Sequence, residues 1–469
     1  MRRRALAIAA TLALALPATA GALPPIKHVW IIVLENESYQ DSFQHPDKAP
    51  YLAGQLPRQG ELLPFYYGIG HESLDNYIAM VSGQSPNADT QSDCQFYRDF
   101  SPGTAGPDGQ AVGQGCVYPA SVKTVADQLA ARGLSWRGYM EDMGTPCRHP
   151  ALNSQDKTQS AHVGDQYASR HDPFVYFHSI IDTPSCQANV VPLTRLSGDL
   201  ASATTTPSYS FITPNLCHDG HDSPCVDGEP GGLTSADQFL RQWVPRITSS
   251  PAYGDGGLIV VTFDEASSGV KGSDSTDCCG EPIGPNSPDP GGPAPGPGGG
   301  RVGAVLLSPF VQPGTVVVTP YNHYALLRSV EDLFGLDHVG YAGLAGLRAF
   351  GSDVFNRAVS GASPAARLLP RVRIAGVPRR CVRRQFTARI VVTAEGLRRL
   401  TVRLDGRRVR SGRRVRVRVG RLRPGRHHLR ATVVDGAGVV ATARVGFSRC
   451  AAAPRRHTPR DVDRPAFIG

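Results

Sequence analysis

The chain has no long apolar run beyond its first 22 residues. Arg2, Arg3 and Arg4 precede an apolar stretch from residue 5 to 16, and small residues at 18–20 offer a cleavage site. This arrangement is typical of a secretory signal peptide, so we predict that residues 1–22 are removed on export. No later stretch approaches the eighteen or so apolar residues that a membrane helix needs. We therefore expect no transmembrane segment in the mature chain, and a secreted protein that is extracellular or at the cell surface.

The sequence also lacks any C-x-x-C pair, the spacing typical of thiolate zinc sites. It has ten cysteines, and an even number in an exported chain predicts disulfides, here five. Cys381 and Cys450 bracket the C-terminal segment and are predicted to pair. The adjacent Cys278 and Cys279 are predicted to reach two different partners, because a bond between neighbours strains the peptide.

Lysine and acidic residues are scarce in the last part of the chain. From Arg371 onward there are 27 Arg, no Lys and 5 acidic residues, a net charge of +22, whereas the preceding part has a net charge of −13. We predict a boundary near residues 358–370 between an acidic domain (23–360) and a basic domain (371–450), followed by a disordered tail (451–469).

The basic domain has short stretches of alternating polarity, separated by Gly-containing turns. This pattern predicts a small immunoglobulin-like β-sandwich. Its charge suggests an anionic lipid or an acidic envelope polymer as a partner, and the alternative is a spacer module. The predicted strands are residues 386–393, 400–404, 415–419, 428–434 and 439–447.

Strand and helix patterns alternate in the larger domain, which predicts an α/β fold with a parallel sheet covered by helices on both faces. Between residues 280 and 300, 15 of 21 residues are Gly or Pro, so we expect a flexible surface loop, placed where it can cover a site. The predicted strands are residues 28–34, 135–140, 209–213, 258–263 and 302–307, and the predicted helices are 121–132, 235–247 and 322–334.

Two of the apolar strands end in oxygen-bearing side chains. Residues 28–34 run directly into Glu35 and Asn36, and residues 258–263 run into Asp264 and Glu265. In open α/β sheets, ligands bind beyond the carboxyl ends of the strands. The pair of strand ends therefore predicts one site for a hard divalent cation, and the alternative is that Glu35 only caps the next turn.

A serine stands at the predicted start of a helix after the first strand, in the stretch from residue 70 to 86. A hydroxyl at this position is usually an N-cap. A helix N-terminus also attracts phosphate, and a serine beside a metal can become a nucleophile, so Ser73 is a candidate for both roles. The G-x-S-x-G elbow of classical serine hydrolases is absent.

Histidines cluster at two further positions. His218, Asp219, His221 and Asp222 follow the predicted strand at 209–213, and His323 opens the predicted helix at 322–334. Each of these residues alone could be a cap or a surface residue. Together with the strand ends they form a set of chemically active groups.

The motifs in order resemble the bacterial phosphoesterase family of acid phosphatases and phospholipases C, in the alkaline-phosphatase-like superfamily. The resemblance covers about residues 26–356 and is closest to a secreted actinobacterial branch that includes a mycobacterial acid phosphatase acting on phosphatidylinositol 3-phosphate. The motifs that carry it are E-N-x-S, H-x-S-x-x-N-Y followed by S-G-x-x-P, P-N-x-x-x-D-G-H-D, T-F-D-E and N-H-Y-x-L-L-R-S-V-E-D-L-F-G-L.

The resemblance implies an alkaline-phosphatase-like sheet and a secreted, metal-dependent phosphomonoesterase with a phosphoserine intermediate. The alternatives are a phospholipase C-type phosphodiesterase and a non-enzymatic surface adhesin. The implied roles are Glu35, Asn36, Asp264 and Glu265 as ligands of one divalent metal (Mg, Ca, Mn or Fe); Ser73 as nucleophile; Asn76 and Asp219 at the phosphate; His221 and His323 as phosphate-binding cations; and His71 as a proton donor to the leaving alcohol.

Overall fold

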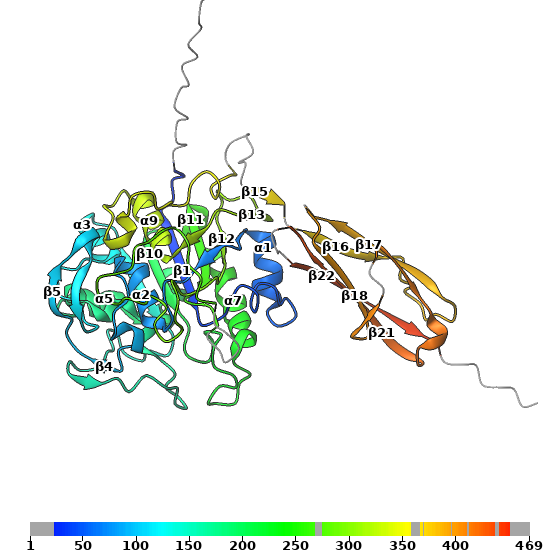
Figure 1. The fold of residues 1–469 in the computed structure, drawn as a ribbon, viewed down its shortest axis with the longest axis horizontal. Helices are drawn as coiled ribbons and strands as arrows, with labels where there is room; N and C mark the ends of the chain where they lie inside the picture. The colour runs from blue at the N-terminus through cyan, green and yellow to red at the C-terminus, as the bar shows by residue number, and fades with distance from the viewer. Residues whose placement is uncertain are drawn as a thin grey trace, which may run out of the picture.

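The computed structural model describes residues 23–267, 274–357, 366–368, 370–394, 396–409, 412–436 and 440–450. The predicted signal peptide and C-terminal tail lie outside these residues, as does most of the predicted boundary segment. Figure 1 shows a large α/β body and, beyond residue 370, an elongated body made of strands.

The first strand lies inside the main sheet, as its apolar sequence predicts. All seven residues of β1 (His28–Leu34) are buried, because it lies between β10 (Tyr209–Thr213) and β11 (Gly257–Phe263), which run parallel to it, and helices cover both faces of the sheet (Figure 1). Strands buried on both faces read as continuous apolar runs. The sheet order is β15-β13-β2-β12-β11-β1-β10-β7-β9, with β7 at Trp136–Met140 and β9 at Val190–Pro192.

The sheet is parallel around β1, as predicted, and becomes mixed toward one edge. β12 (Ala304–Leu307) runs antiparallel to β11 and to β2 (Glu61–Leu63), and β15 (Ala366–Leu368) runs antiparallel to β13 (Thr315–Val317). A parallel return needs a crossover, usually a helix. The chain between β11 and β12 is rich in Gly and Pro and forms no helix among its described residues, so β12 pairs antiparallel.

Helices cover the sheet on both sides (Figure 1). α2 (Ser73–Ser82), α3 (Val125–Ala131) and α9 (His323–Phe334) lie together on one side, and α7 (Gly232–Thr248) lies on the other. α3 begins four residues later than predicted because Thr124 forms a capping box with Asp127. The shorter elements include η1 (Pro50–Gln55), α1 (Leu56–Gln59), β3 (Tyr66–Tyr67), β4 (Phe96–Tyr97), β5 (Ser101–Ala105), β6 (Ala111–Gln114), β8 (Ser154–Gln155), η4 (Ser169–His171), α4 (His178–Ile181), α5 (Pro184–Asn189), α6 (Leu196–Asp199), α8 (Pro251–Gly254) and β14 (Tyr321–Asn322).

All ten cysteines form disulfides, and the five bonds confirm the predicted number. Cys381 pairs with Cys450, also as predicted. The prediction for Cys278 and Cys279 is wrong, because they bond to each other. The remaining six cysteines each find a partner at 8 to 39 residues' separation, which leaves the adjacent pair with no other thiol; these bonds are Cys94–Cys116, Cys147–Cys186 and Cys217–Cys225.

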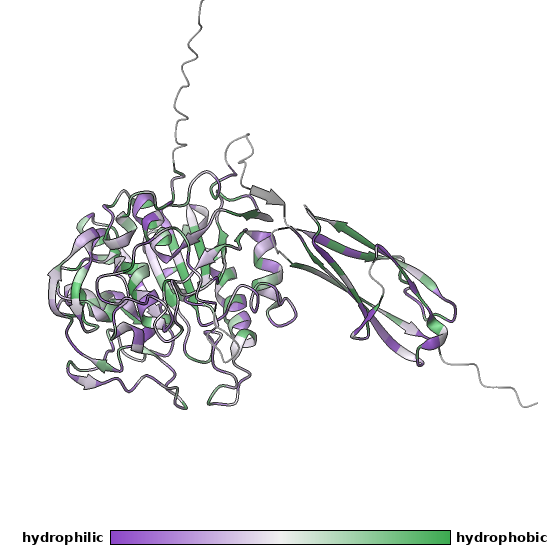
Figure 2. Ribbon diagram, viewed as in Figure 1, coloured by the Kyte–Doolittle hydropathy of each residue, from purple (hydrophilic) through white to green (hydrophobic). Residues whose placement is uncertain are grey.

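The C-terminal strands form two antiparallel sheets that pack around their own core. One sheet has the order β16-β17-β20 and the other β19-β18-β21-β22, and apolar and polar positions alternate along the strands (Figure 2). The packing makes a β-sandwich, as the sequence pattern predicts. Its strands are β16 (Arg371–Ala375), β17 (Phe386–Thr393), β18 (Arg399–Leu404), β19 (Arg407–Val409), β20 (Arg414–Val417), β21 (Gly425–Val434) and β22 (Val440–Arg449).

Over the residues that the structure describes, no helix has the length and apolar character that crossing a membrane would require.

A buried carboxyl in β2 makes the stability of the large domain depend on pH. Glu61 is fully buried; its Oε1 accepts hydrogen bonds from Thr315 Oγ1 and Asn356 Nδ2, each at 2.7 Å, and its Oε2 has no partner. Burial raises the pKa of Glu61 to about 8. The folded-state pKa of Glu61 lies above that of the unfolded chain. The neutral carboxyl therefore contributes its full stabilisation of the fold below pH about 4.5, and this contribution is lost as the pH rises through about 8.

Glu61→Gln keeps the oxygen that accepts both hydrogen bonds and removes the charge. We expect the variant to match wild type below pH about 4.5. Above pH 8 it should be more stable by on the order of 5 kcal/mol. Urea unfolding at several pH values measures this difference, and parallel pH profiles for the two proteins would contradict the assignment.

Candidate active site

Four predicted ligands meet at one edge of the main sheet. Leu34 of β1 lies opposite Phe263 of β11, so the residues that follow both strands emerge side by side. The backbone N–H of Asn36 donates to Asp264 Oδ1 at 2.9 Å, and Asn36 Nδ2 donates to Glu265 Oε1 at 2.6 Å. The structure therefore brings together the groups that the two strand ends predict to be neighbours.

Buried negative charge is concentrated at this edge. Glu35, Asp219, Asp264 and Glu265 are each at most 2% exposed. Burial raises the pKa of all four, and repulsion from Glu35 raises the pKa of the other three further. Asp219 Oδ2 and Asp264 Oδ2 are buried with no hydrogen-bond partner. Carboxylates held close together out of water are stable as anions only when a cation accompanies them.

The donor chemistry at this edge fits a hard divalent cation, which prefers oxygen ligands. The carboxylate oxygens of Glu35, Asp264 and Glu265 do not all lie within 4.8 Å of one another, however. Two groups of His, Cys, Asp or Glu among the described residues do meet this distance. Both contain Cys217, which is bonded to Cys225. A cation shared by Glu35, Asp264 and Glu265 would therefore require their side chains to rotate toward one another.

Ser73 lies against this carboxylate cluster. It is the first residue of α2, and its hydroxyl donates to Glu35 Oε2 at 2.7 Å. The preceding residue, Glu72, has φ +84° and ψ +141°, a conformation that non-Gly residues rarely adopt and that is often found at functional sites. The hydroxyl thus points at the strand end, and no side-chain hydrogen bond caps the helix at the N-cap position.

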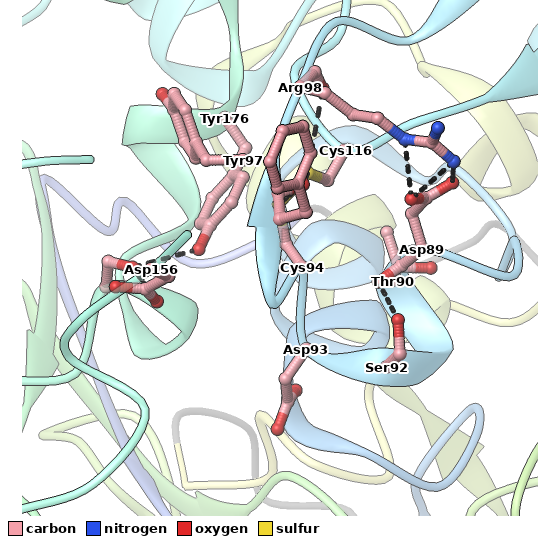
Figure 3. Close-up of a disulfide and its surroundings, with 12 residues drawn as sticks. Asp89, Thr90, Ser92, Asp93, Cys94, Tyr97, Arg98, Cys116, Asp156 and Tyr176 are labelled. Carbon is pink, nitrogen blue, oxygen red and sulfur yellow. Dashed lines mark hydrogen bonds and ion pairs between the residues drawn. A yellow bond between two sulfur atoms is a disulfide. The ribbon is translucent and has the colours of Figure 1, made fainter. Parts of the chain in front are cut away.

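A disulfide loop supports the start of α2. Asp93 Oδ1 accepts a hydrogen bond from the backbone N–H of Leu74 at 2.9 Å. The neighbouring Cys94 is bonded to Cys116, and Figure 3 shows Asp93 beside this bond with its carboxylate directed away from it. The disulfide therefore fixes a group that satisfies one of the free N–H groups at the helix start.

Asn76 does not face the cluster. Its Oδ1 accepts from the backbone N–H of Ile69 and Gly70 at 2.7 and 3.2 Å, and its Nδ2 donates to the carbonyls of Gly70 and Glu72 at 2.9 and 3.1 Å. These bonds occupy both ends of the amide and hold the loop before Ser73. The conformation thus does not support the predicted contact between Asn76 and a phosphate oxygen.

His71 is a buried partner of the cluster. Its Nδ1 contacts Glu265 Oε2, and its Nε2 lies 3.3 Å from the carbonyl oxygen of Asp274. The ring is 1% exposed. With both nitrogens engaged, His71 positions Glu265, and the structure does not present it to a leaving alcohol.

His323 is also buried, and this environment disfavours the cationic form that the resemblance implies. Its Nε2 lies 2.5 Å from the carbonyl oxygen of Asp264, and its Nδ1 lies 3.1 Å from the hydroxyl of Tyr66. Burial lowers the pKa of His323 to about 4. A neutral imidazole that donates from Nε2 and accepts at Nδ1 matches both neighbours. Sequence reasoning could not anticipate this burial from the position at a helix start.

Of the three histidines with implied roles, His71, His221 and His323, His221 is the one with an exposed side chain. Its side chain is 55% exposed and lies 3.1 Å from Asp222 Oδ1. The hydrogen bond to Asp222 raises the pKa of His221 to about 9, with Asp219 and Glu35 adding to the shift. His221 is thus protonated at neutral pH, and its backbone N–H donates to Asp219 Oδ1 at 3.0 Å.

Arg170 and His171 were missed by the sequence analysis. Arg170 Nε pairs with Asp93 Oδ2 at 3.2 Å, and its charge lowers the pKa of Glu35. The nitrogens of His171 lie 3.3 Å from Glu35 Oε2 and 3.9 Å from Asp219 Oδ2. The available signal was the polar run from Asp165 to Asp172, which resembles the clusters after the strands but follows no strand pattern.

His171 adds an imidazole to the oxygen donors. It is 2% exposed and stacks on Tyr77, whose hydroxyl donates to Glu35. Burial lowers the pKa of His171 well below its usual value, and neither ring nitrogen has a hydrogen-bond partner. A neutral imidazole with an unpaired nitrogen is a common metal ligand.

The Gly/Pro-rich loop packs against this region, in agreement with its expected position. The N–H of Gly68 donates to the carbonyl of Gly300 at 2.9 Å, and Ala266 N–H donates to the carbonyl of Gly299 at 2.8 Å. A Cβ on Gly68 would come within 2.7 Å of the Asp264 carbonyl oxygen. The close approach of the loop to the site thus requires glycine there.

The sequence is similar to one protein family and to known phosphatases. The model of the Phosphoesterase family matches residues 45–337, which include Ser73, His221, Asp264 and His323 but not Glu35. An acid phosphatase of Aspergillus fumigatus is 27% identical over 315 residues, 66% of this chain and 55% of that protein. The phosphatidylinositol-3-phosphatase of Mycobacterium tuberculosis is 25% identical over 323 residues, 69% of this chain and 82% of that protein.

The chain thus spans about half the length of the Aspergillus relative. Among solved structures, a protein of the alkaline phosphatase superfamily from Vibrio parahaemolyticus aligns with a TM-score of 0.41 and 11% identity, over 80% of this chain and 78% of that one.

Proposed function

Because this chain belongs to the Phosphoesterase family, we propose that it is a metal-dependent phosphomonoesterase that uses Ser73 as its nucleophile. The observation that carries the proposal is the hydrogen bond from the Ser73 hydroxyl to Glu35, within a cluster of buried carboxylates at the carboxyl end of two parallel strands. The names of the relatives, acid phosphatase and phosphatidylinositol-3-phosphatase, support phosphate monoesters as the substrate class.

The cation would be held by Glu35, Asp264 and Glu265, with the amide of Asn36 beside them. When bound, a divalent metal supplies positive charge to the phosphoryl oxygens and favours the alkoxide form of serine. Two unpaired carboxylate oxygens and the unpaired imidazole of His171 support this assignment. Oxygen-rich donors favour Mg, Ca, Mn or Fe over a thiolate-bound metal.

The residues of the chain then divide the chemistry. The Ser73 oxygen attacks phosphorus, and its proton leaves toward Glu35, which already accepts it at 2.7 Å. The bond from phosphorus to the alcohol oxygen breaks, and His221, protonated and exposed to solvent, gives a proton to that oxygen. Water then loses a proton to the now neutral His221 and attacks phosphorus. The bond from phosphorus to the Ser73 oxygen breaks, Glu35 returns its proton to that oxygen, and phosphate leaves. Arg170 supplies positive charge near Glu35 throughout.

We also propose that the protein is exported. Five disulfides fit an oxidising compartment, in which such bonds form and persist. The N-terminal residues 1–22 have the composition of a signal peptide.

The test compares an aryl monophosphate, a phosphoinositide monoester and phosphatidylcholine near pH 6, with and without a chelator. A monoester offers three non-bridging oxygens to the cationic groups, whereas a diester offers two. A bound diester therefore leaves one cationic group of the site unsatisfied, and an unsatisfied buried group costs about 1–3 kcal/mol. We expect kcat/KM to be roughly ten- to a hundredfold higher for the monoesters. Chelation should abolish turnover, and added divalent metal should restore it.

Two outcomes would contradict the proposal. Faster release of phosphocholine than of inorganic phosphate would identify a phospholipase C-type phosphodiesterase. No hydrolysis of any ester, by a folded protein loaded with each candidate metal, would favour the non-enzymatic adhesin.

A further inference from the structure

Four arginines form a row across the larger sheet of the β-sandwich. Arg408 of β19 lies opposite Arg403 of β18, Arg403 lies opposite Arg430 of β21, and Arg430 lies opposite Arg444 of β22. Residues directly opposite on antiparallel strands point to the same face. Neighbouring strands are about 4.8 Å apart, so the row extends over roughly 14 Å. We call these four residues the arginine row.

The arginine row is on the outer face of the sandwich. Val402, Leu429 and Ala431, its neighbours along the strands, are fully buried in the core. Successive side chains of a strand point to opposite faces, so the arginines face outward. Three of them are exposed and Arg430 is partly exposed.

Stability of the fold does not explain the arginine row. Like charges directly opposite each other on neighbouring strands are destabilising. In the part of the chain that the structure describes, one ion pair reaches the row, between Arg430 and Asp47 at 3.5 Å. A sheet face shaped only by stability would alternate the signs of its charges, so the row indicates a ligand that carries the opposite charge.

The row opens on a cleft of about 1090 Å³ between the sandwich and the segment from residue 43 to 62. Thr432 and Thr442, the row next to the arginines, also line it and offer hydroxyl groups. Six arginines line the cleft, three from the row and three from elsewhere; they are Arg58, Arg371, Arg373, Arg403, Arg430 and Arg444.

We propose that the arginine row and its cleft bind a linear polymer of phosphate groups. Guanidinium groups bind phosphate through two parallel hydrogen bonds, and a row at strand spacing offers such a group at each step along a chain. A bilayer is flat and cannot enter a concave cleft, so the geometry favours a polymer over a lipid surface. The proposal does not depend on catalytic activity.

The test measures binding of fluorescently labelled inorganic polyphosphate to the full-length protein by anisotropy at several salt concentrations. One variant replaces all four residues of the row with glutamine. The matched control makes four Arg→Gln changes at exposed positions of the other sheet and its flank, Arg389, Arg414, Arg416 and Arg418, and so removes the same charge. Thermal unfolding checks that both variants fold.

We expect the row variant to bind at least tenfold more weakly, with the slope of log affinity against log salt reduced in magnitude by about three to four. The control should lose less than about threefold. Arg444→Gln alone, on the edge strand β22, should reduce the magnitude of the slope by about one and serves if the fourfold variant does not fold.

Equal losses in the row and control variants would mean that only net charge matters and would overturn the proposal. Absence of polyphosphate binding by wild type would do the same. Binding to vesicles of anionic phospholipid without binding to polyphosphate would assign the row to a membrane surface instead.

Discussion

Ser73→Ala is expected to lower kcat/KM for an aryl monophosphate by about a thousandfold or more while leaving the fold intact. The Ser73 hydroxyl is the group that donates to Glu35, and Ser73 is the first residue of α2. A loss of this size corresponds to about 4 kcal/mol of transition-state stabilisation. Loss of a hydroxyl that served only as a helix cap would instead lower stability by about 1 kcal/mol and leave turnover nearly unchanged.

Ser82→Ala is the matched control for this variant. Ser82 is in the same helix and is equally buried, but its hydroxyl donates to the carbonyl of Ile78 within the helix. We expect Ser82→Ala to keep wild-type kcat/KM within a few-fold. If the two variants lose activity equally, the loss comes from disturbing α2 and Ser73 is not the nucleophile.

The second large effect is expected for Asp264→Asn, which removes one charge from the carboxylate cluster without changing its shape. Asp264 Oδ2 is buried with no hydrogen-bond partner among the described residues, and burial together with the nearby charge of Glu35 raises the pKa of Asp264. In the metal-free protein, an amide here can donate to Glu35 and relieves the repulsion. We therefore expect metal-free Asp264→Asn to unfold at a higher temperature than metal-free wild type.

The same variant should lose metal binding. Divalent metal stabilises wild type by mass action if it binds the folded state, so added metal should raise the unfolding temperature of wild type but not of Asp264→Asn. Turnover should fall at least a hundredfold. Asp237→Asn, at a buried carboxylate of α7 outside the cluster, should keep the response to metal. A normal metal response in Asp264→Asn would remove Asp264 from the ligand set.

The strand ends could be predicted from the sequence because the residues that indicate them are neighbours in the chain. An apolar run that stops at a carboxylate and an amide identifies both a buried strand and its ligand end, and parallel pairing then brings Glu35, Asn36, Asp264 and Glu265 together. The β-sandwich could be predicted for the same reason, since the alternation of apolar and polar residues lies within each strand and the turn residues lie within the adjoining loop.

The features that sequence reasoning missed depend on tertiary contacts. His323 starts a helix, as predicted, but its neutrality comes from the carbonyl of Asp264 and from Tyr66, which lie far away in the chain. Arg170 and His171 belong to a single turn, η4, and reach Glu35 only through packing. The antiparallel direction of β12 follows from the length and composition of its connection, which the strand itself does not reveal.

The most direct test of the account is a rapid acid quench of the wild-type enzyme during turnover of a labelled phosphate monoester, followed by digestion and peptide mapping. A phosphoserine intermediate predicts label on the peptide that contains Ser73, at up to one phosphate per enzyme, and no label in Ser73→Ala. Turnover at the wild-type rate with no label on that peptide, or with label at another residue, would contradict the assignment of Ser73 as the nucleophile.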